Sequence, residues 1–116
     1  MATPGNYVLS IYRGDTHRWR FVLWADAGKT QQSDLTGAVV EAQIQMMGSP
    51  VINLGCTVTL PNVVDALLSA PDSKKLSSGR GLWDMQVTLP SGDVTTVLRG
   101  DVMITADVTV VGGEAG

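Results

Sequence analysis

The strongest constraint on the fold is a period-two alternation of apolar and polar residues that recurs along the chain. Between Ala38 and Met47, apolar residues take every even position, and Glu or Gln takes three of the odd ones. Such alternation places the two sets of side chains on opposite faces of a β-strand. Gly, Pro, Asp and Asn interrupt the pattern every 8 to 12 residues or so, which is the spacing typical of an all-β domain.

The pattern predicts an all-β fold, a single antiparallel β-sandwich that is immunoglobulin-like in size, with 7 or 8 strands. We expect strands over 7–12, 16–25, 38–47, 51–60, 63–69, 82–89, 94–98 and 102–111. A bend or bulge is expected at Gly100, between the last two. The exception to the β pattern is Pro71–Leu76, where proline, an early acid and late lysines favour one short helical turn near 71–76.

The length of 116 residues fits one ordinary domain. We therefore predict a single β-sandwich domain over 1–111. The segment 112–116, Gly-Gly-Glu-Ala-Gly, has no side chains suited to packing. It is expected to be a flexible C-terminal tail.

Charge and composition exclude several classes of function. Charged residues make up 16% of the chain and the net charge is −3, so we expect no nucleic-acid partner. No apolar run approaches the ~20 residues of a membrane helix, and no secretory signal is apparent at the N-terminus. We therefore expect no membrane association and assembly in a cytoplasm. One cysteine and one histidine exclude an internal disulfide and multi-histidine metal sites.

The sequence contains no recognisable constellation of reactive residues. We therefore predict that the chain is not an enzyme and has no catalytic, cofactor-binding or metal-binding residues. Gly28-Lys29-Thr30 ends like a phosphate-binding loop but lacks the earlier glycine and the following helix. Asp15 is expected in a turn and His17 near a sheet edge, without the pocket that an acid–base pair needs. Cys56 lies within an apolar face and is expected to be buried and inert. Arg13-Gly14-Asp15 matches an integrin-recognition tripeptide, and we interpret it as an ordinary turn.

The predicted strand over 16–25 supplies the candidate partner interface. Its inward face is expected to carry Trp19, Phe21 and Leu23, and its outward face Arg18, Arg20, Val22 and Trp24. An exposed tryptophan often marks a binding hot spot. Alternatively, a break in register near Ala25 places the ring under the polar connection 26–37. We predict an interface formed by Trp24, Arg20 and Val22, with Arg18 at its rim and a possible cation–π contact between Arg20 and Trp24. Trp83 is expected in the core.

The charge distribution also bears on association. The strands predicted between Ala38 and Leu60, and from Val102 to Val111, contain no Lys or Arg. Edge strands are usually protected by such charges. We therefore expect these strands to offer edges for pairing with another chain.

The order of the motifs resembles small structural proteins of tailed bacteriophages. The first half carries Tyr12-Arg13-Gly14-Asp15-Thr16 and Asp34-Leu35-Thr36-Gly37-Ala38, and the second half carries Leu82-Trp83-Asp84-Met85-Gln86-Val87 and Leu98-Arg99-Gly100-Asp101-Val102. The likeness is closest to minor tail proteins of phages that infect actinobacteria and to the N-terminal domain of baseplate upper proteins.

This resemblance implies a non-enzymatic structural component of the virion, a minor tail, tail-tip or baseplate protein. Its implied partners are other virion proteins, with the chain present in several copies or as an oligomer. A head-decoration (capsid) protein of similar fold is the alternative. A more distant alternative is a carbohydrate-binding module for attachment to the host surface, with Trp24 and Tyr7 or Tyr12 as a stacking platform.

Overall fold

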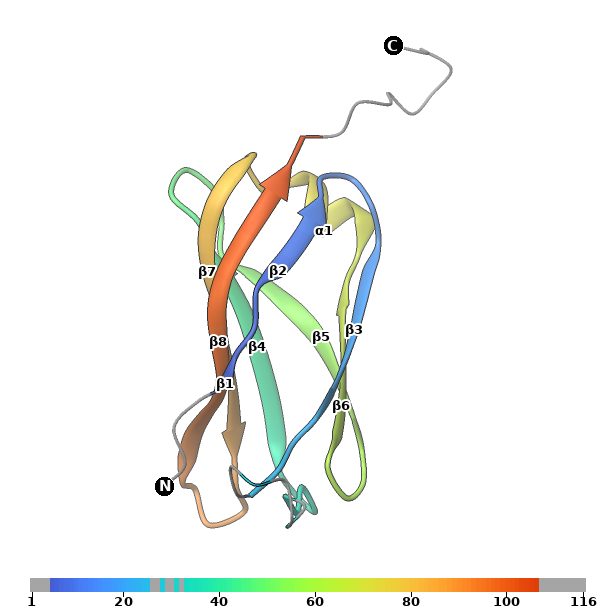
Figure 1. Cartoon of the computed structure of the whole chain (residues 1–116), viewed down its shortest axis with the longest axis vertical. Coiled ribbons are helices and arrows are strands. Elements are labelled where there is room, and N and C mark those ends of the chain that lie inside the picture. The colour runs from blue at the N-terminus through green and yellow to red at the C-terminus, as the bar shows by residue number, and fades with distance from the viewer. Residues whose placement is uncertain (1–4, 26–27, 29–30, 32, 107–116) are drawn as a thin grey trace.

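Eight β-strands form one continuous, curled sheet in the computed structural model, which describes residues 5–25, 28, 31 and 33–106 (Figure 1). The elements are β1 (Gly5–Asn6), β2 (Leu9–Tyr12), β3 (His17–Val22), β4 (Val39–Gln45), β5 (Ile52–Thr59), β6 (Val63–Leu68), α1 (Ala70–Lys74), β7 (Gly79–Thr88) and β8 (Val94–Thr105). The predicted tail 112–116 and the end of the last predicted strand, 107–111, lie outside the described residues.

The strand order is β1-β8-β7-β4-β5-β6-β3, with β2 also paired to β8. Both β1 and β2 run parallel to β8, whereas every other pairing is antiparallel. The all-β class is thus confirmed, but the sheet is mixed rather than purely antiparallel. Alternation of side chains is the same in both strand directions, so the sequence pattern carries no signal for the parallel pairings.

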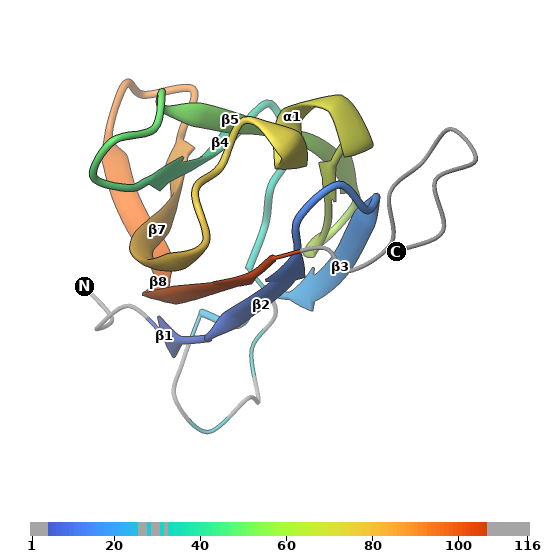
Figure 2. The ribbon, with the colours of Figure 1, turned by 90° about the horizontal axis from the view of Figure 1, so that it is seen from above.

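Strand β5 joins the two halves of the sheet. Its first part, Ile52–Leu54, pairs with β4, and its second part, Gly55–Thr59, pairs with β6. Viewed down the long axis, the strands curl around a common interior, with α1 over one end (Figure 2). The result is an open half-barrel. The sheet begins at β1 and ends at β3, and these two terminal strands do not pair with each other.

The interior is filled by the inward side chains that the alternation predicts. Trp83 is 3% exposed, as expected for a core residue, and its ring stacks on Phe21 with centroids 5.6 Å apart. The other core residues include Leu9, Ile11, Ala42, Ile44, Leu54, Val64, Leu68, Met85 and Val102. The face opposite the core on each strand is called the outer face below.

Helix α1 lies where the sequence predicts a short helical turn. Ser69 is its N-cap, and its hydroxyl accepts a hydrogen bond from the Asp72 amide at 3.3 Å. The turn after β2 docks on this helix: the Gly14 amide donates to Ser73 Oγ at 2.6 Å, and Arg13 Nε donates to the Leu76 carbonyl at 3.0 Å. Arg13-Gly14-Asp15 is therefore a turn packed against α1, as predicted.

Gly100 occupies a continuous strand, which corrects the expectation of a bend or bulge there. The irregularity lies earlier in β8, where Met85 pairs with Leu98 and Gln86 with Thr96, so that Val97 is the extra residue. Gly100 instead admits the neighbouring backbone, because a Cβ at this position would overlap the Tyr7 carbonyl oxygen. Glycine is required here because nothing larger than hydrogen fits.

The expectation of free edges in 38–60 and 102–111 is wrong for the described part of β8, which lies between β7 and the pair β1 and β2, and for Ala42–Ile44 of β4, which pair with both β5 and β7. It holds in part for β5, since among the described strands Ile52–Leu54 pair only with β4 and Gly55–Thr59 pair only with β6. The low charge of β8 and of the centre of β4 reflects their interior position in the sheet. One edge of the sheet is β3, which carries Arg18 and Arg20, in agreement with the rule that edges carry charge.

Candidate functional site

The predicted interface residues lie on the outer face of β3. Arg18, Arg20 and Val22 are exposed, with Val22 at 49%, whereas Phe21 on the same strand is buried. Trp24 follows the strand and is half-buried. It is therefore neither fully exposed, as expected of a binding hot spot, nor fully buried, as expected of a ring under the connection 26–37. Leu23, just before Trp24, forms two hydrogen bonds with Asn62. The Leu23 amide donates to the Asn62 carbonyl at 2.8 Å, and Asn62 Nδ2 donates to the Leu23 carbonyl at 2.8 Å.

Arg20 forms an ion pair across the sheet. Its Nε donates to Asp65 Oδ1 at 2.8 Å, and its Nη2 donates to Asp65 Oδ2 at 3.4 Å. This carboxylate raises the pKa of the Arg20 guanidinium, through the hydrogen bond first and through charge attraction second. Asp65 faces Arg20 in the β3–β6 register. The guanidinium is thus engaged by a carboxylate, a contact that the sequence does not predict.

Neighbouring strands extend this surface. In the β3–β6–β5 register, Val22 aligns with Val63 and Thr59, and Arg18 aligns with Leu67 and Gly55. We call this surface the docking face and define it by Arg18, Arg20, Val22, Val63, Asp65 and Leu67. It combines apolar side chains with charges at its centre and rim. That mixture is typical of surfaces that bind other proteins.

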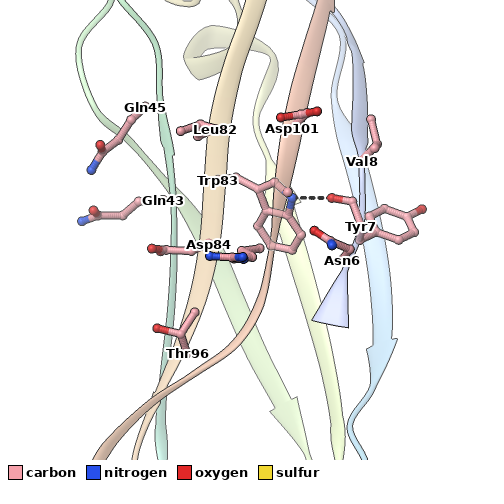
Figure 3. A pocket seen from close by; sticks show the side chains of 12 residues that line it. Asn6, Tyr7, Val8, Gln43, Gln45, Leu82, Trp83, Asp84, Thr96 and Asp101 are labelled. Atoms are coloured by element: carbon pink, nitrogen blue, oxygen red, sulfur yellow. Dashed lines mark hydrogen bonds between the residues drawn. The ribbon is translucent and has the colours of Figure 1, made fainter. Parts of the chain in front are cut away.

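A second surface lies on the outer side of the other half of the sheet. There, a shallow groove of about 830 Å³ crosses β1, β8, β7 and β4 (Figure 3). Its lining includes Asn6, Gln43, Gln45, Leu82, Asp84, Thr96, Arg99 and Asp101. We call this surface the polar groove.

Four of these polar side chains belong to one row across the sheet. Asn6 is the partner of Arg99, Arg99 of Asp84, and Asp84 of Gln43 in the strand registers. Adjacent strands are about 4.8 Å apart, so the row is roughly 14 Å long. Sequence analysis missed this row because it becomes visible only when the strand pairings are known.

One wall of the groove is fixed by contacts around Tyr7. Trp83 Nε1 donates to the Tyr7 carbonyl at 2.7 Å, and the Tyr7 amide donates to the Arg99 carbonyl at 3.0 Å. The Tyr7 ring meets Phe21 edge-on, with centroids 5.3 Å apart. These contacts hold the β1–β2 connection against β8.

The remaining candidates have structural roles. His17 Nε2 accepts the Tyr12 amide at 3.1 Å, and the imidazole stacks on Trp19 at 5.6 Å. Cys56 is half-buried rather than fully buried, and desolvation raises the pKa of its thiol, with a smaller contribution from the charge of Glu41. Tyr12 ends β2 beside the start of β3 and Trp24 follows the far end of β3, about 20 Å along that strand. These two rings therefore form no common stacking platform.

Two features are absent from the described ranges, 5–25, 28, 31 and 33–106. These ranges contain no group of three or more His, Cys, Asp or Glu side chains that could hold a metal ion. The same ranges include no helix that is long and apolar enough to cross a membrane.

The fold that these elements define is shared with a phage protein and with a bacterial adhesin. The chain is similar to the N-terminal domain of phage TP901-1 ORF48, with a TM-score of 0.55 and 11% identity over 88% of this chain and 89% of that one. It is also similar to the SrpA adhesin (R347E mutant) from Streptococcus sanguinis, with a TM-score of 0.50 and 16% identity over 85% of this chain. The match spans about half, 55%, of that adhesin chain. No protein-family model and no curated protein sequence matches the chain.

Proposed function

We propose that this chain is a non-enzymatic structural component of a tailed-phage virion, in the tail tip or baseplate. The observation that carries the proposal is the match of almost the whole chain to the N-terminal domain of a phage protein. The motifs Gly14-Asp15-Thr16 and Asp34-Leu35-Thr36-Gly37 point to the same source, because they resemble those of phage minor tail and baseplate proteins. In this role the chain acts in assembly by binding other virion proteins, and it is present in several copies.

In this proposal the docking face contacts the neighbouring subunit, with Trp24 at its margin. Val22 is exposed beside Val63, and Leu67 is exposed two rows further along the same face, beyond the Arg20–Asp65 pair. Burying such apolar area supplies the free energy of association. Arg18 has no ion pair in the described part of the chain, which leaves its charge available to an acidic partner.

Immunogold labelling of purified particles tests the proposal. Antibody against the chain is expected to label the end of the tail, in few copies per particle. Labelling of the shell would support head decoration and overturn the tail assignment. Absence of the chain from purified particles would overturn the virion role itself.

Incorporation of variants tests the docking face. Val22→Asp and Arg18→Glu are expected to reduce incorporation into particles while leaving thermal unfolding unchanged. Trp24→Ala is expected to reduce incorporation as well. Gln86→Asp is the matched control, because Gln86 is exposed on β7 and belongs to neither surface. Equal incorporation of Val22→Asp, Arg18→Glu and Gln86→Asp would remove the docking face from the proposal.

A further inference from the structure

The polar groove is lined by polar side chains that have no hydrogen-bond partner within the described residues. Within the described residues, none of its seven polar side chains has a hydrogen bond or ion pair to another side chain or to the backbone. They are Asn6, Gln43, Gln45, Asp84, Thr96, Arg99 and Asp101. The docking face differs in this respect, since Arg20 and Asp65 there are paired with each other.

These groups are mounted on a rigid support. Gln43, Asp84 and Arg99 project from β4, β7 and β8, each hydrogen-bonded to strands on both sides. The hydrogen bond from the Trp83 indole to the Tyr7 carbonyl fixes the β1–β2 connection, which forms one wall of the groove. The backbone positions that carry these donors and acceptors are therefore fixed before a ligand binds, and only the side chains remain to be ordered.

From this geometry we propose that the polar groove binds a neutral oligosaccharide. Amide, carboxylate and guanidinium groups together offer donors and acceptors in one row, which suits the hydroxyls of a sugar chain, since each hydroxyl both donates and accepts. Leu82 lies in the same groove and is 63% exposed, which provides an apolar surface for the C–H face of a pyranose ring. Pockets that bind small ligands commonly combine apolar area with a few placed polar groups.

The charges of the groove disfavour other ligand classes. Two carboxylates, Asp84 and Asp101, accompany one guanidinium, Arg99, so phosphate-rich polymers and strongly anionic sugars are repelled. Arg99, Asp84 and Gln43 lie on interior strands, whose backbone groups are already paired within the sheet. Asn6 lies on the edge strand β1, which is only two residues long and gives an extended peptide little edge on which to add a strand.

The inference goes beyond the proposed virion role and uses other residues. Loss of sugar binding would leave the docking face and its incorporation test unaffected. Conversely, a chain absent from particles would still be expected to bind the sugar.

Titration of the ¹⁵N-labelled chain with cellohexaose, maltohexaose, isomaltohexaose and chitohexaose, followed by amide chemical shifts, tests the site. At least one sugar at millimolar concentration is expected to shift amides of the groove strands β4, β7 and β8. Arg99→Ala and Gln43→Ala are expected to weaken that binding by about tenfold each, the effect of losing one to two good hydrogen bonds. Arg80→Ala is the matched control, because Arg80 is exposed on β7 and does not line the groove.

Three outcomes would overturn the proposal. The first is the absence of shifts in groove amides with all four sugars. The second is binding that Arg99→Ala and Arg80→Ala weaken equally, which would indicate a non-specific charge effect. The third is a groove response to a hexapeptide rich in Ser, Thr and Asn with no response to any sugar, which would assign the groove to a peptide.

Discussion

The indole nitrogen of Trp83 donates a hydrogen bond of 2.7 Å to the carbonyl oxygen of Tyr7, residues that are far apart in the sequence. This bond ties the first strand segment to the centre of the sheet. The same carbonyl lies over Gly100, which has no side chain to obstruct it. One tryptophan and one glycine therefore determine how closely the N-terminal segment packs on β8.

Replacing Trp83 by Phe is expected to lower the free energy of unfolding, because the Tyr7 carbonyl loses its donor and the smaller phenyl ring leaves unfilled volume in the core. The loss specific to this bond is about 1–3 kcal/mol. The measurement is urea denaturation. Trp19→Phe is the matched control, since the half-buried Trp19 indole N–H has no protein acceptor in the described part of the chain. Equal destabilisation by the two substitutions would contradict the assigned role of the bond.

Gly100→Ala is expected to destabilise the chain by about 1–3 kcal/mol, because the added methyl group overlaps the Tyr7 carbonyl and displaces the backbone. Gly55→Ala serves as the comparison within a strand. A Cβ at Gly55 meets its nearest atoms, those of Leu67, at 3.9 Å, which is an ordinary contact. Thermal unfolding of both variants checks the prediction, and a tolerated Gly100→Ala would contradict the close approach.

Asn62→Ala is expected to cost about 1–3 kcal/mol of stability, because the side chain is 3% exposed and its Nδ2 supports the Leu23 carbonyl at 2.8 Å. Asn53→Ala is the control, since Asn53 is exposed on the outer face of β5. Chemical denaturation is the measurement. Similar losses for Asn62→Ala and Asn53→Ala would show that the buried bond contributes nothing.

The Cys56 thiol is expected to react slowly with iodoacetamide, with a pH midpoint above its ordinary value of 9.0. Burial is the main cause of this raised pKa, and the Glu41 charge adds to it. Glu41→Gln is therefore expected to lower the midpoint, whereas Asp93→Asn, at an exposed residue of the β7–β8 turn whose charge does not shift the Cys56 pKa, serves as the charge-matched control. A midpoint that both substitutions leave in place would exclude the influence of Glu41.

The same pKa shift has a consequence for stability. The folded chain retains the thiol proton to higher pH than the unfolded chain does. Stability is therefore unaffected below the unfolded pKa and falls as the pH rises through the folded one. Cys56→Ser is expected to remove this part of the pH dependence in denaturation experiments.

The alternation predicted which side chains face the core far better than it predicted how strands pair. Trp83, Ala42 and Ile44 are buried as expected, because a single strand's periodicity already separates its two faces. The parallel pairing of β2 with β8 and the partnership of Arg20 with Asp65 depend on register between distant segments. No pattern within one strand encodes that register.

The same reason explains what was missed at the two surfaces. Arg18, Arg20 and Val22 form part of one face because they alternate along a single strand. The row of Asn6, Arg99, Asp84 and Gln43 is assembled from four strands, and was therefore not predicted. Gly100 was interpreted as a bend, since its close neighbour Tyr7 comes from the other end of the sequence.

The pairing of β1 and β2 with β8 has a consequence for synthesis of the chain. These first strands emerge from the ribosome 93 residues before the residues with which they pair, Gly5 with Leu98 and Leu9 with Val102. Their backbone groups remain exposed to water until β8 has been synthesised. Completion of the half-barrel is thus a late event that follows release of β8. A nascent chain stalled after β7 is expected to expose both segments to proteases.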